Sequence, residues 1–165
     1  MFNFLKINNN KYKSSGFTLM EILIIIAIVT VISSIVLFNL SNFRNEQDLK
    51  NAEMEIVSLL DKARQNTLSS VNSNNYSVHF EVDKAVLFSG SIYSALDSSN
   101  EKINFNANVS IPAIDGINLG GGGNDVTFER LTGETMGGTL ILRLKSDASK
   151  QKTITINKTG LISSN

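Results

Sequence analysis

A single carboxylate, that of Glu21, lies near the start of a long apolar segment. Residues 22–40 contain no charged side chain, and isoleucine, valine and leucine dominate them. A carboxylate in such surroundings is costly unless it is paired, because neither hydrocarbon nor packed apolar side chains solvate a charge. Gly16 and Phe17 join this segment to a basic, acid-free stretch at the start of the chain. Residues 16–21 are therefore the first candidate site.

The sequence Gly16-Phe17-Thr18-Leu19-Met20-Glu21-Ile22 resembles the cleavage and methylation signal of type IV pilins and type II secretion pseudopilins. The usual form of that signal is Gly followed by Phe-Thr-Leu-Ile-Glu-Leu, so this chain differs only at Met20 and Ile22. The resemblance implies that a prepilin peptidase cleaves between Gly16 and Phe17, and that Phe17 is then N-methylated. It also implies that Glu21 pairs with the methylated amine of a neighbouring subunit in a filament, which favours one axial register.

Each of these residues also has a simpler interpretation. Gly16 suits the position before a scissile bond, since a protease cleft requires a small residue there, but it could be an ordinary loop glycine. Glu21 could be an acid near a membrane interface that extends its carboxylate to water.

Charge and composition indicate one small domain with an anchor. The chain has 165 residues, no cysteine and a net charge of zero. Residues 1–16 contribute +3, residues 17–40 contribute −1, and residues 41–165 contribute −2. The basic leader predicts a cytoplasmic N-terminus, with the C-terminal domain outside the cytoplasmic membrane. An ordinary secretory signal fits less well, because no small-residue cleavage site follows the apolar segment near residues 39–42.

Residues 17–71 predict one long helix. Its first part, residues 17–40, measures about 36 Å as a helix, which is enough to cross a bilayer. Its second part, residues 41–71, is amphipathic, and the turn cluster at residues 72–75 ends it. The apolar face of this second part consists of Leu49, Ala52, Ile56, Leu59, Leu60, Ala63 and Thr67. Polar residues, Glu53 among them, occupy the rest of its surface.

Residues 72–165 predict a mostly antiparallel β domain, and the fold class is α+β with a pilin-like arrangement. The helix is expected to cover one sheet of this domain. The first hairpin joins residues 76–82 to 85–89, and the strongest later pair joins 139–145 to 152–157. Further strands are expected at residues 102–105, 109–111, 126–129 and 160–162.

A second resemblance covers most of this domain. It is a resemblance to H-type minor pseudopilins and FimT-like pilins. It begins with the segment Ala63-Arg64-Gln65-Asn66-Thr67 and continues through residues 126–128, Gly133, residues 140–142 and 153–156, and Gly160. The same spaced apolar and glycine positions also suit any small β sandwich.

Other candidate residues give no catalytic or metal site. His79 is the only histidine and is expected as a surface residue of a strand, and no nucleophile motif accompanies it. The glycines 120–123 precede no Lys-Ser/Thr pair, so they predict a flexible loop rather than a phosphate loop. Oxygen-bearing residues flank this loop, but their spacing matches no calcium loop. We therefore expect no metal, no cofactor and no enzymatic activity.

The C-terminal region has one local excess of positive charge, and its five basic residues are Arg143, Lys145, Lys150, Lys152 and Lys158. FimT-like pilins are associated with DNA capture through basic residues near the C-terminus. The tail of this chain has no arginine, and a solvated lysine face on an edge strand explains the same residues. DNA binding is thus an alternative, and the lysine face is favoured.

Taken together, the sequence predicts a minor pilin or H-type minor pseudopilin. Its expected partners are a prepilin peptidase and methyltransferase, membrane lipid before assembly, an inner-membrane assembly platform, and other pilins in a helical filament. A DNA-binding minor pilin and a membrane-anchored domain with no role in a filament remain the alternatives.

Overall fold

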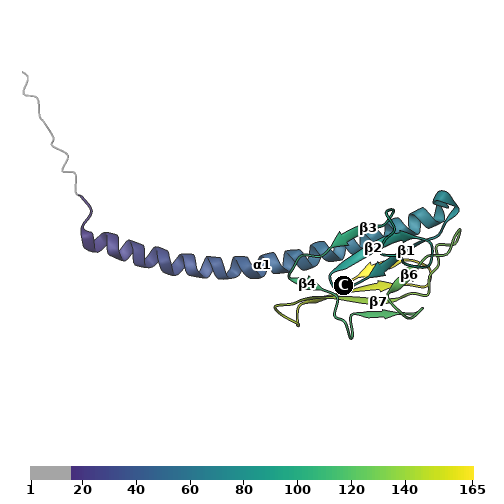
Figure 1. The fold of residues 1–165 in the computed structure, drawn as a ribbon. Coiled ribbons are helices and arrows are strands. Elements are labelled where there is room, and N and C mark those ends of the chain that lie inside the picture. Colours follow the sequence, from purple (N-terminus) through teal and green to yellow (C-terminus); the bar gives the residue numbers. More distant parts are fainter. Residues whose placement is uncertain (1–15) are drawn as a thin grey trace, which may run out of the picture. The chain divides into compact units, whose positions relative to one another are not determined.

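The computed structural model describes residues 16–165, apart from the side chains of residues 36–42. The chain divides into two compact units, Met1–Leu40 and Ser41–Asn165. Helix α1, Leu19–Leu68, contributes to both units (Figure 1). The other elements all belong to the second unit, and they are η1 (Val71–Ser73), β1 (Tyr76–Phe80), β2 (Lys84–Ser89), β3 (Glu101–Asn104), β4 (Val109–Ser110), β5 (Ile117–Leu119), β6 (Asp125–Thr127), β7 (Gly138–Leu144), β8 (Gln151–Ile156) and β9 (Ile162–Ser164).

The long helix is confirmed, and α1 ends three residues before the predicted boundary. Ser70, Asn72 and Ser73 adopt left-handed backbone angles with φ of 47°, 52° and 58°, which a continuing α-helix does not allow. Thr67 secures this end, because its buried hydroxyl donates to the Ala63 carbonyl at 2.8 Å and accepts the N–H of Tyr76 at 2.8 Å. The helix end is thereby joined to the start of β1.

Within the first unit, the helix exposes large apolar side chains throughout the described stretch 19–35. Among the described residues, no helical segment is both long enough and apolar enough to span a membrane. The predicted span at residues 17–40 includes residues 36–40, whose side chains lie outside the description. The membrane span therefore remains a prediction.

In the second unit, all seven predicted core residues of the amphipathic helix are buried, from Leu49 to Thr67. Glu53 differs from the expectation, since it is buried with an exposed fraction of 7% rather than solvated. It lies at the border of the buried face, where Lys152 of β8 covers it with an Nζ–Oε2 distance of 3.7 Å. The ion pair thus accompanies the burial of this carboxylate.

The strands form two antiparallel sheets. One sheet has the order β3-β2-β1-β6, and the other has the order β4-β7-β8-β9 with β5 also paired to β7. Both predicted hairpins, β1–β2 and β7–β8, are confirmed. The short strand β5 had not been predicted, because only three residues and one buried side chain, Leu119, mark it in the sequence.

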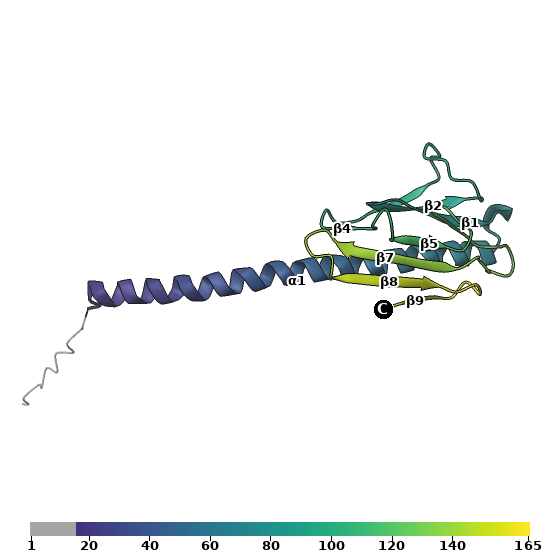
Figure 2. The ribbon, with the colours of Figure 1, turned by 90° about the horizontal axis from the view of Figure 1, so that it is seen from below.

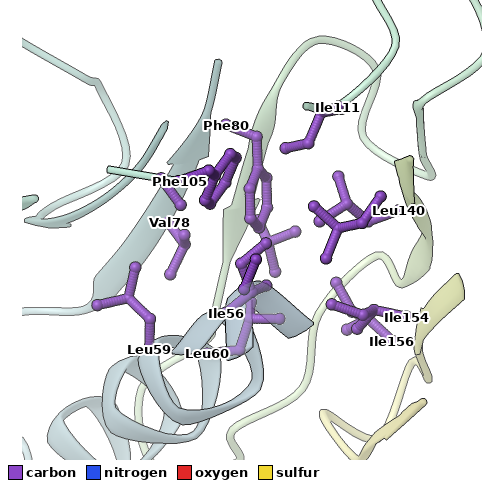
Figure 3. Close-up of a cluster of buried hydrophobic side chains, with 14 of the residues drawn as sticks. Ile56, Leu59, Leu60, Val78, Phe80, Phe105, Ile111, Leu140, Ile154 and Ile156 are labelled. Atoms are coloured by element: carbon purple, nitrogen blue, oxygen red, sulfur yellow. The ribbon is translucent and has the colours of Figure 1, made fainter. Parts of the chain in front are cut away.

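The core lies between α1 and both sheets, so the expectation that the helix packs on one sheet was too narrow. Ile56 and Leu60 of α1 point toward Phe80 of one sheet and toward Leu140 and Ile154 of the other (Figure 3). Each of these five side chains is at most 1% exposed. The amphipathic part of α1 therefore belongs to the folding unit of the β domain.

Candidate functional site

The candidate site begins at the first turn of α1. The hydroxyl of Thr18 accepts a hydrogen bond from the backbone N–H of Glu21 at 3.2 Å, and the Thr18 carbonyl accepts the N–H of Ile22 at 3.2 Å. Thr18 is thus the N-cap, and Glu21 is the third residue of the helix. Threonine at the N-cap with glutamate three residues later is the sequence of a capping box. The site sequence therefore also fixes where the helix begins.

Gly16 and Phe17 precede the helix in non-helical backbone. Both are exposed, and the side chain of Phe17 is 74% exposed. A Cβ atom added to Gly16 would meet nothing within 4 Å. No contact within the described chain therefore requires a glycine at position 16, and both residues of the predicted cleavage site are exposed.

The electrostatics of this helix end favour an acid at position 21. The unpaired N–H groups at the start of a helix create a partial positive charge, and Glu21 lies in the first turn, where a carboxylate is stabilised. A cleaved chain beginning at Phe17 would add the positive charge of an amine at the same end. One carboxylate from the same or a neighbouring chain can then offset that charge.

Three residues of the second resemblance, Arg64, Gly133 and Gly160, meet near the C-terminal end of α1. A Cβ atom added to Gly160 would overlap the carbonyl oxygen of Gly133 and would lie 2.7 Å from Nε of Arg64. The Arg64 guanidinium also donates to the Thr159 carbonyl at 3.5 Å. Both glycines have positive φ, 67° at Gly133 and 77° at Gly160. These three residues form a packing junction between the helix and two turns, and no local pattern in the sequence indicated that they lie close together.

Most of the predicted basic cluster is compensated by carboxylates. Arg143 lies 3.1 Å from Asp115, Lys150 lies 2.5 Å from Glu46, and Lys152 pairs with Glu53. Lys145 and Lys158 are exposed, and within the described part of the chain they have no ion pair. The local excess of positive charge is therefore smaller than the sequence suggested. DNA binding stays an untested prediction that has lost its main electrostatic support.

His79 is less exposed than expected, with 18% of its side chain accessible. Its Nδ1 bonds to the carboxylate of Asp125, the residue opposite it on β6. Its ring stacks on Tyr93 with centroids 3.9 Å apart and planes inclined by 11°. Sequence reasoning missed this cluster because the partners come from a distant strand and a loop. It joins β1, β6 and the loop after β2.

The glycine-rich loop, residues 120–123, follows the unpredicted strand β5 and precedes β6. Gly122 and Gly123 have positive φ of 69° and 74°, and an added Cβ would meet nothing within 4 Å at either position. Across residues 16–165, no group of three or more acidic, histidine or cysteine side chains is arranged to hold a metal ion. The oxygen-bearing residues around this loop do not assemble into a candidate site.

Comparison with protein families agrees with the geometry at the N-terminus. Residues 11–37 match the family model described as the prokaryotic N-terminal methylation motif. The match contains Gly16, Phe17 and Glu21 together with most of the apolar segment. The chain thus has a prepilin-type methylation motif at the start of α1. No curated protein sequence gives a significant match.

Comparison with solved structures identifies the fold. The minor pseudopilin EpsH of the Vibrio cholerae type 2 secretion system aligns with a TM-score of 0.55 and 13% identity, over 72% of this chain and 96% of that one. The type IV minor pilin FimU of Pseudomonas aeruginosa aligns with a TM-score of 0.55 and 15% identity, over 74% and 92% of the two chains. The long helix and antiparallel strands of this chain therefore form the pilin fold of EpsH and FimU.

Proposed function

From the methylation motif and the pilin fold, we propose that this chain is a structural subunit of a helical filament. It is either a minor pilin of a type IV pilus or an H-type minor pseudopilin of a type II secretion pseudopilus. The observation behind this proposal is the exposed Gly16–Phe17 junction, which directly precedes a capped apolar helix bearing Glu21. EpsH is a minor pseudopilin and FimU is a minor pilin, so the likeness supports both variants equally.

Maturation makes the N-terminus of α1 functional. A prepilin peptidase cleaves after Gly16, and a methyltransferase then modifies the new amine of Phe17. The open surroundings of Gly16 suit entry into a protease cleft. The resulting cation lies near the positive end of the helix, where a carboxylate is needed to offset it. Glu21 of an adjacent subunit supplies that carboxylate and thereby sets the axial register between helices.

The apolar part of α1 meets two environments in succession. Residues 19–35 expose large apolar side chains that water does not favour, so lipid or other helices must cover them. Before assembly, residues 17–40 lie in the cytoplasmic membrane with the basic leader on the cytoplasmic side. An inner-membrane platform then transfers the subunit into the filament. Moving an apolar helix from lipid into contact with other helices gains little free energy from the hydrophobic effect, because lipid is equally apolar. The Glu21 ion pair therefore supplies the specificity of assembly.

The β domain acts as the outward-facing part of the subunit, and its role is structural rather than catalytic. The core joins both sheets to the amphipathic part of α1, so the domain is anchored to the helix that enters the filament. The subunit is thus a substrate of the processing enzymes and, once processed, a component of the filament.

The test is incorporation into filaments sheared from cells. Glu21→Ala should leave the protein in the membrane fraction but reduce its amount in filaments by about tenfold or more, because the amine of a neighbour loses its counter-ion. Glu129→Ala is the matched control, since Glu129 is exposed and forms no ion pair among the described residues. Equal incorporation of the two variants would refute the role of Glu21.

A further inference from the structure

A loop covers the second face of the sheet β3-β2-β1-β6. On the first face of this sheet, the side chains that join the core are Val78, Phe80, Ala85 and Leu87. Side chains alternate along a strand, so Val86 and Phe88 point to the second face. Figure 2 shows β2 on the side of the second unit away from β8 and β9, so its second face points out of the unit. Val86 and Phe88 are nevertheless only 0% and 3% exposed, which means that another segment covers them.

The cover is the segment 91–99 between β2 and β3, which we call the strap. Its Tyr93 packs against Phe88 with ring centroids 5.5 Å apart, and it stacks on His79 with centroids 3.9 Å apart. His79 lies directly opposite Val86 in the pairing of β1 with β2. Tyr93 therefore contacts two neighbours of Val86 on this face and covers the position between them.

The strap is weakly attached apart from Tyr93. Every other residue from 91 to 99 is exposed. Within the described chain, the hydrogen bonds of the strap join it only to itself and to Asn100, as in the bond from the Asp97 N–H to the Ser94 carbonyl at 3.3 Å. Its single charged residue, Asp97, accepts hydrogen bonds from Ser99. A segment held by one side chain can open locally without unfolding of the domain.

The imidazole ring beneath Tyr93 lies between two carboxylates. Nδ1 of His79 bonds to Asp125 of β6, and Nε2 lies 3.9 Å from Oε1 of Glu81. A neutral imidazole has a single N–H, whereas the charged ring has one on each nitrogen. The charged ring therefore offers a donor and an attractive charge to each carboxylate. Since 18% of its side chain is accessible, His79 can exchange its proton with water.

Two cations lie on the same face of the sheet, and neither neutralises Asp125. Lys84 of β2 pairs with Glu81 at 3.0 Å, and this hydrogen bond raises the pKa of Lys84, so Lys84 stays charged at neutral pH. Lys102 of β3 lies two strands from His79, at about 10 Å, where solvent screens it. Asp125 has no other ion pair in the described part of the chain. Its carboxylate therefore remains available to a charged His79.

We propose that His79 is a pH-sensitive latch, whose charged ring holds Tyr93 and keeps the strap closed, and whose neutral ring releases it. The two carboxylates belong to β6 and to the end of β1, so they stay beside His79 when the strap opens. The closed state differs by the contact with Tyr93, whose ring attracts a stacked cation and shields the His79–Asp125 pair from water. An unpaired cation would lose hydration under the strap, whereas this one keeps a partner and part of its exposure.

Opening of the strap should increase with pH. The closed strap favours the charged ring, so its stability is greatest where the ring is charged and is lost as the proton leaves. Histidine changes its charge between about pH 5 and pH 8. His79 is the only histidine of the chain, so apart from the terminal amine no other group here ordinarily titrates in that range.

The strap presents two large apolar side chains to solvent. Ile92 is 87% exposed and Leu96 is 96% exposed. The latch thus determines how firmly these two side chains are held in place. It lies within the second unit and does not depend on cleavage after Gly16, so it goes beyond the proposed role in a filament.

Thiol labelling of the full chain in detergent micelles tests the latch. The chain has no cysteine, so one introduced thiol reports on its own position. Val86→Cys places the thiol beneath the strap and Val78→Cys places it in the core, and both positions are 0% exposed. Each variant is labelled with a maleimide at about pH 5 and about pH 8. Dividing the rate for V86C by the rate for V78C removes the pH dependence of the thiol itself and the contribution of global unfolding.

This ratio should rise about fivefold from the lower to the higher pH, because the cation on Tyr93 is lost. His79→Gln keeps a hydrogen-bonding side chain but cannot become charged, so its ratio should be the same at both pH values. Asp125→Asn should diminish the rise, whereas the matched change Glu129→Gln, at an exposed carboxylate elsewhere, should leave it intact. The V78C rate shows in each variant whether the core is still folded.

Tyr93→Ala tests the cover directly, since V86C should then be labelled rapidly at both pH values while the V78C rate stays unchanged. Slow labelling of V86C in Tyr93→Ala would show that the strap does not close over Val86. A ratio that does not change with pH when His79 is present, or an equal rise in a folded His79→Gln chain, would overturn the latch.

Discussion

The hydroxyl of Thr67 accepts the backbone N–H of Tyr76 at 2.8 Å, and this bond joins the last turn of α1 to the first strand. The same hydroxyl donates to the Ala63 carbonyl at 2.8 Å, and Thr67 is fully buried. One side chain thus satisfies two backbone groups at the point where the chain changes from helix to sheet.

Thr67→Val keeps the shape of this side chain but removes both hydrogen bonds. The partly buried N–H of Tyr76 loses its acceptor, which should lower the free energy of unfolding of the second unit by about 1–3 kcal/mol. Chemical denaturation of the detergent-solubilised chain, followed by circular dichroism, measures the change. Thr67→Ser should retain most of the stability, and Thr155→Val on a half-buried strand position is the control. Equal effects of the two valine substitutions would contradict the role of the hydroxyl.

Gly160→Ala tests the junction with Arg64 and Gly133. Its added Cβ would overlap the Gly133 carbonyl, whereas Gly122→Ala has a similar φ, 69° against 77°, but open space around it. Both changes impose the left-handed backbone on alanine, at about 1–2 kcal/mol. The overlap should make Gly160→Ala about 1–3 kcal/mol more destabilising than Gly122→Ala. A comparable midpoint for both variants in thermal unfolding would show that the junction is loosely packed.

The sequence predicted local features well and distant contacts poorly. Every position that the helical periodicity from Leu49 to Thr67 assigned to the apolar face is buried. This face could be predicted because a 3.6-residue repeat is visible within the segment itself. The two hairpins were also found, since their partners are neighbours in the chain. The pairing of β1 with β6, and of His79 with Asp125, spans 46 residues and leaves no local pattern. The division into two sheets was missed for that reason.

The candidate site shows the same contrast. The motif at Gly16, Phe17 and Glu21 is contiguous, so the sequence alone located it. The ion pairs that compensate Arg143, Lys150 and Lys152 come from a loop residue, Asp115, and from α1. Counting charges along the chain therefore overestimated the basic patch.

Thr18→Ala should loosen the first turn of α1 without removing the helix. Loss of an N-cap costs about 1 kcal/mol, so the amide of Glu21 should exchange with solvent about fivefold faster. Hydrogen exchange of the chain in micelles measures this rate. Thr18→Ser keeps a capping hydroxyl and should exchange at the original rate. An unchanged rate in Thr18→Ala would mean that the 3.2 Å bond to Glu21 does not protect that amide.

Two turns with the same local pattern give a prediction about pH. The hydroxyl and N–H of Ser149 donate to Asp147 and hold the pKa of that carboxyl below its ordinary value of 3.8, and Ser99 lowers the pKa of Asp97 in the same way. A carboxyl group whose pKa is lowered by folding stabilises the fold at pH values above its pKa in the unfolded chain. This contribution is lost as the pH falls through the pKa in the folded chain. Ser149→Ala should therefore raise the pKa of Asp147 and leave that of Asp97 unchanged. Carboxyl NMR titration distinguishes the two, and an unmoved Asp147 would contradict the assignment.

Gly16→Leu should prevent maturation while Gly16→Ala permits it. The open surroundings of Gly16 mean that neither side chain disturbs the described structure, so any effect arises in the protease cleft. Immunoblotting resolves the two forms, because the uncleaved chain is longer by residues 1–16. Normal cleavage of Gly16→Leu would exclude a requirement for a small residue before the scissile bond.

The most direct test of the central claim is mass spectrometry of the N-terminal peptide, on protein isolated from cells with an active prepilin peptidase. The proposed function predicts that this peptide begins at Phe17 and has an N-methylated amine. A mature protein that still begins at Met1 in those cells would contradict it.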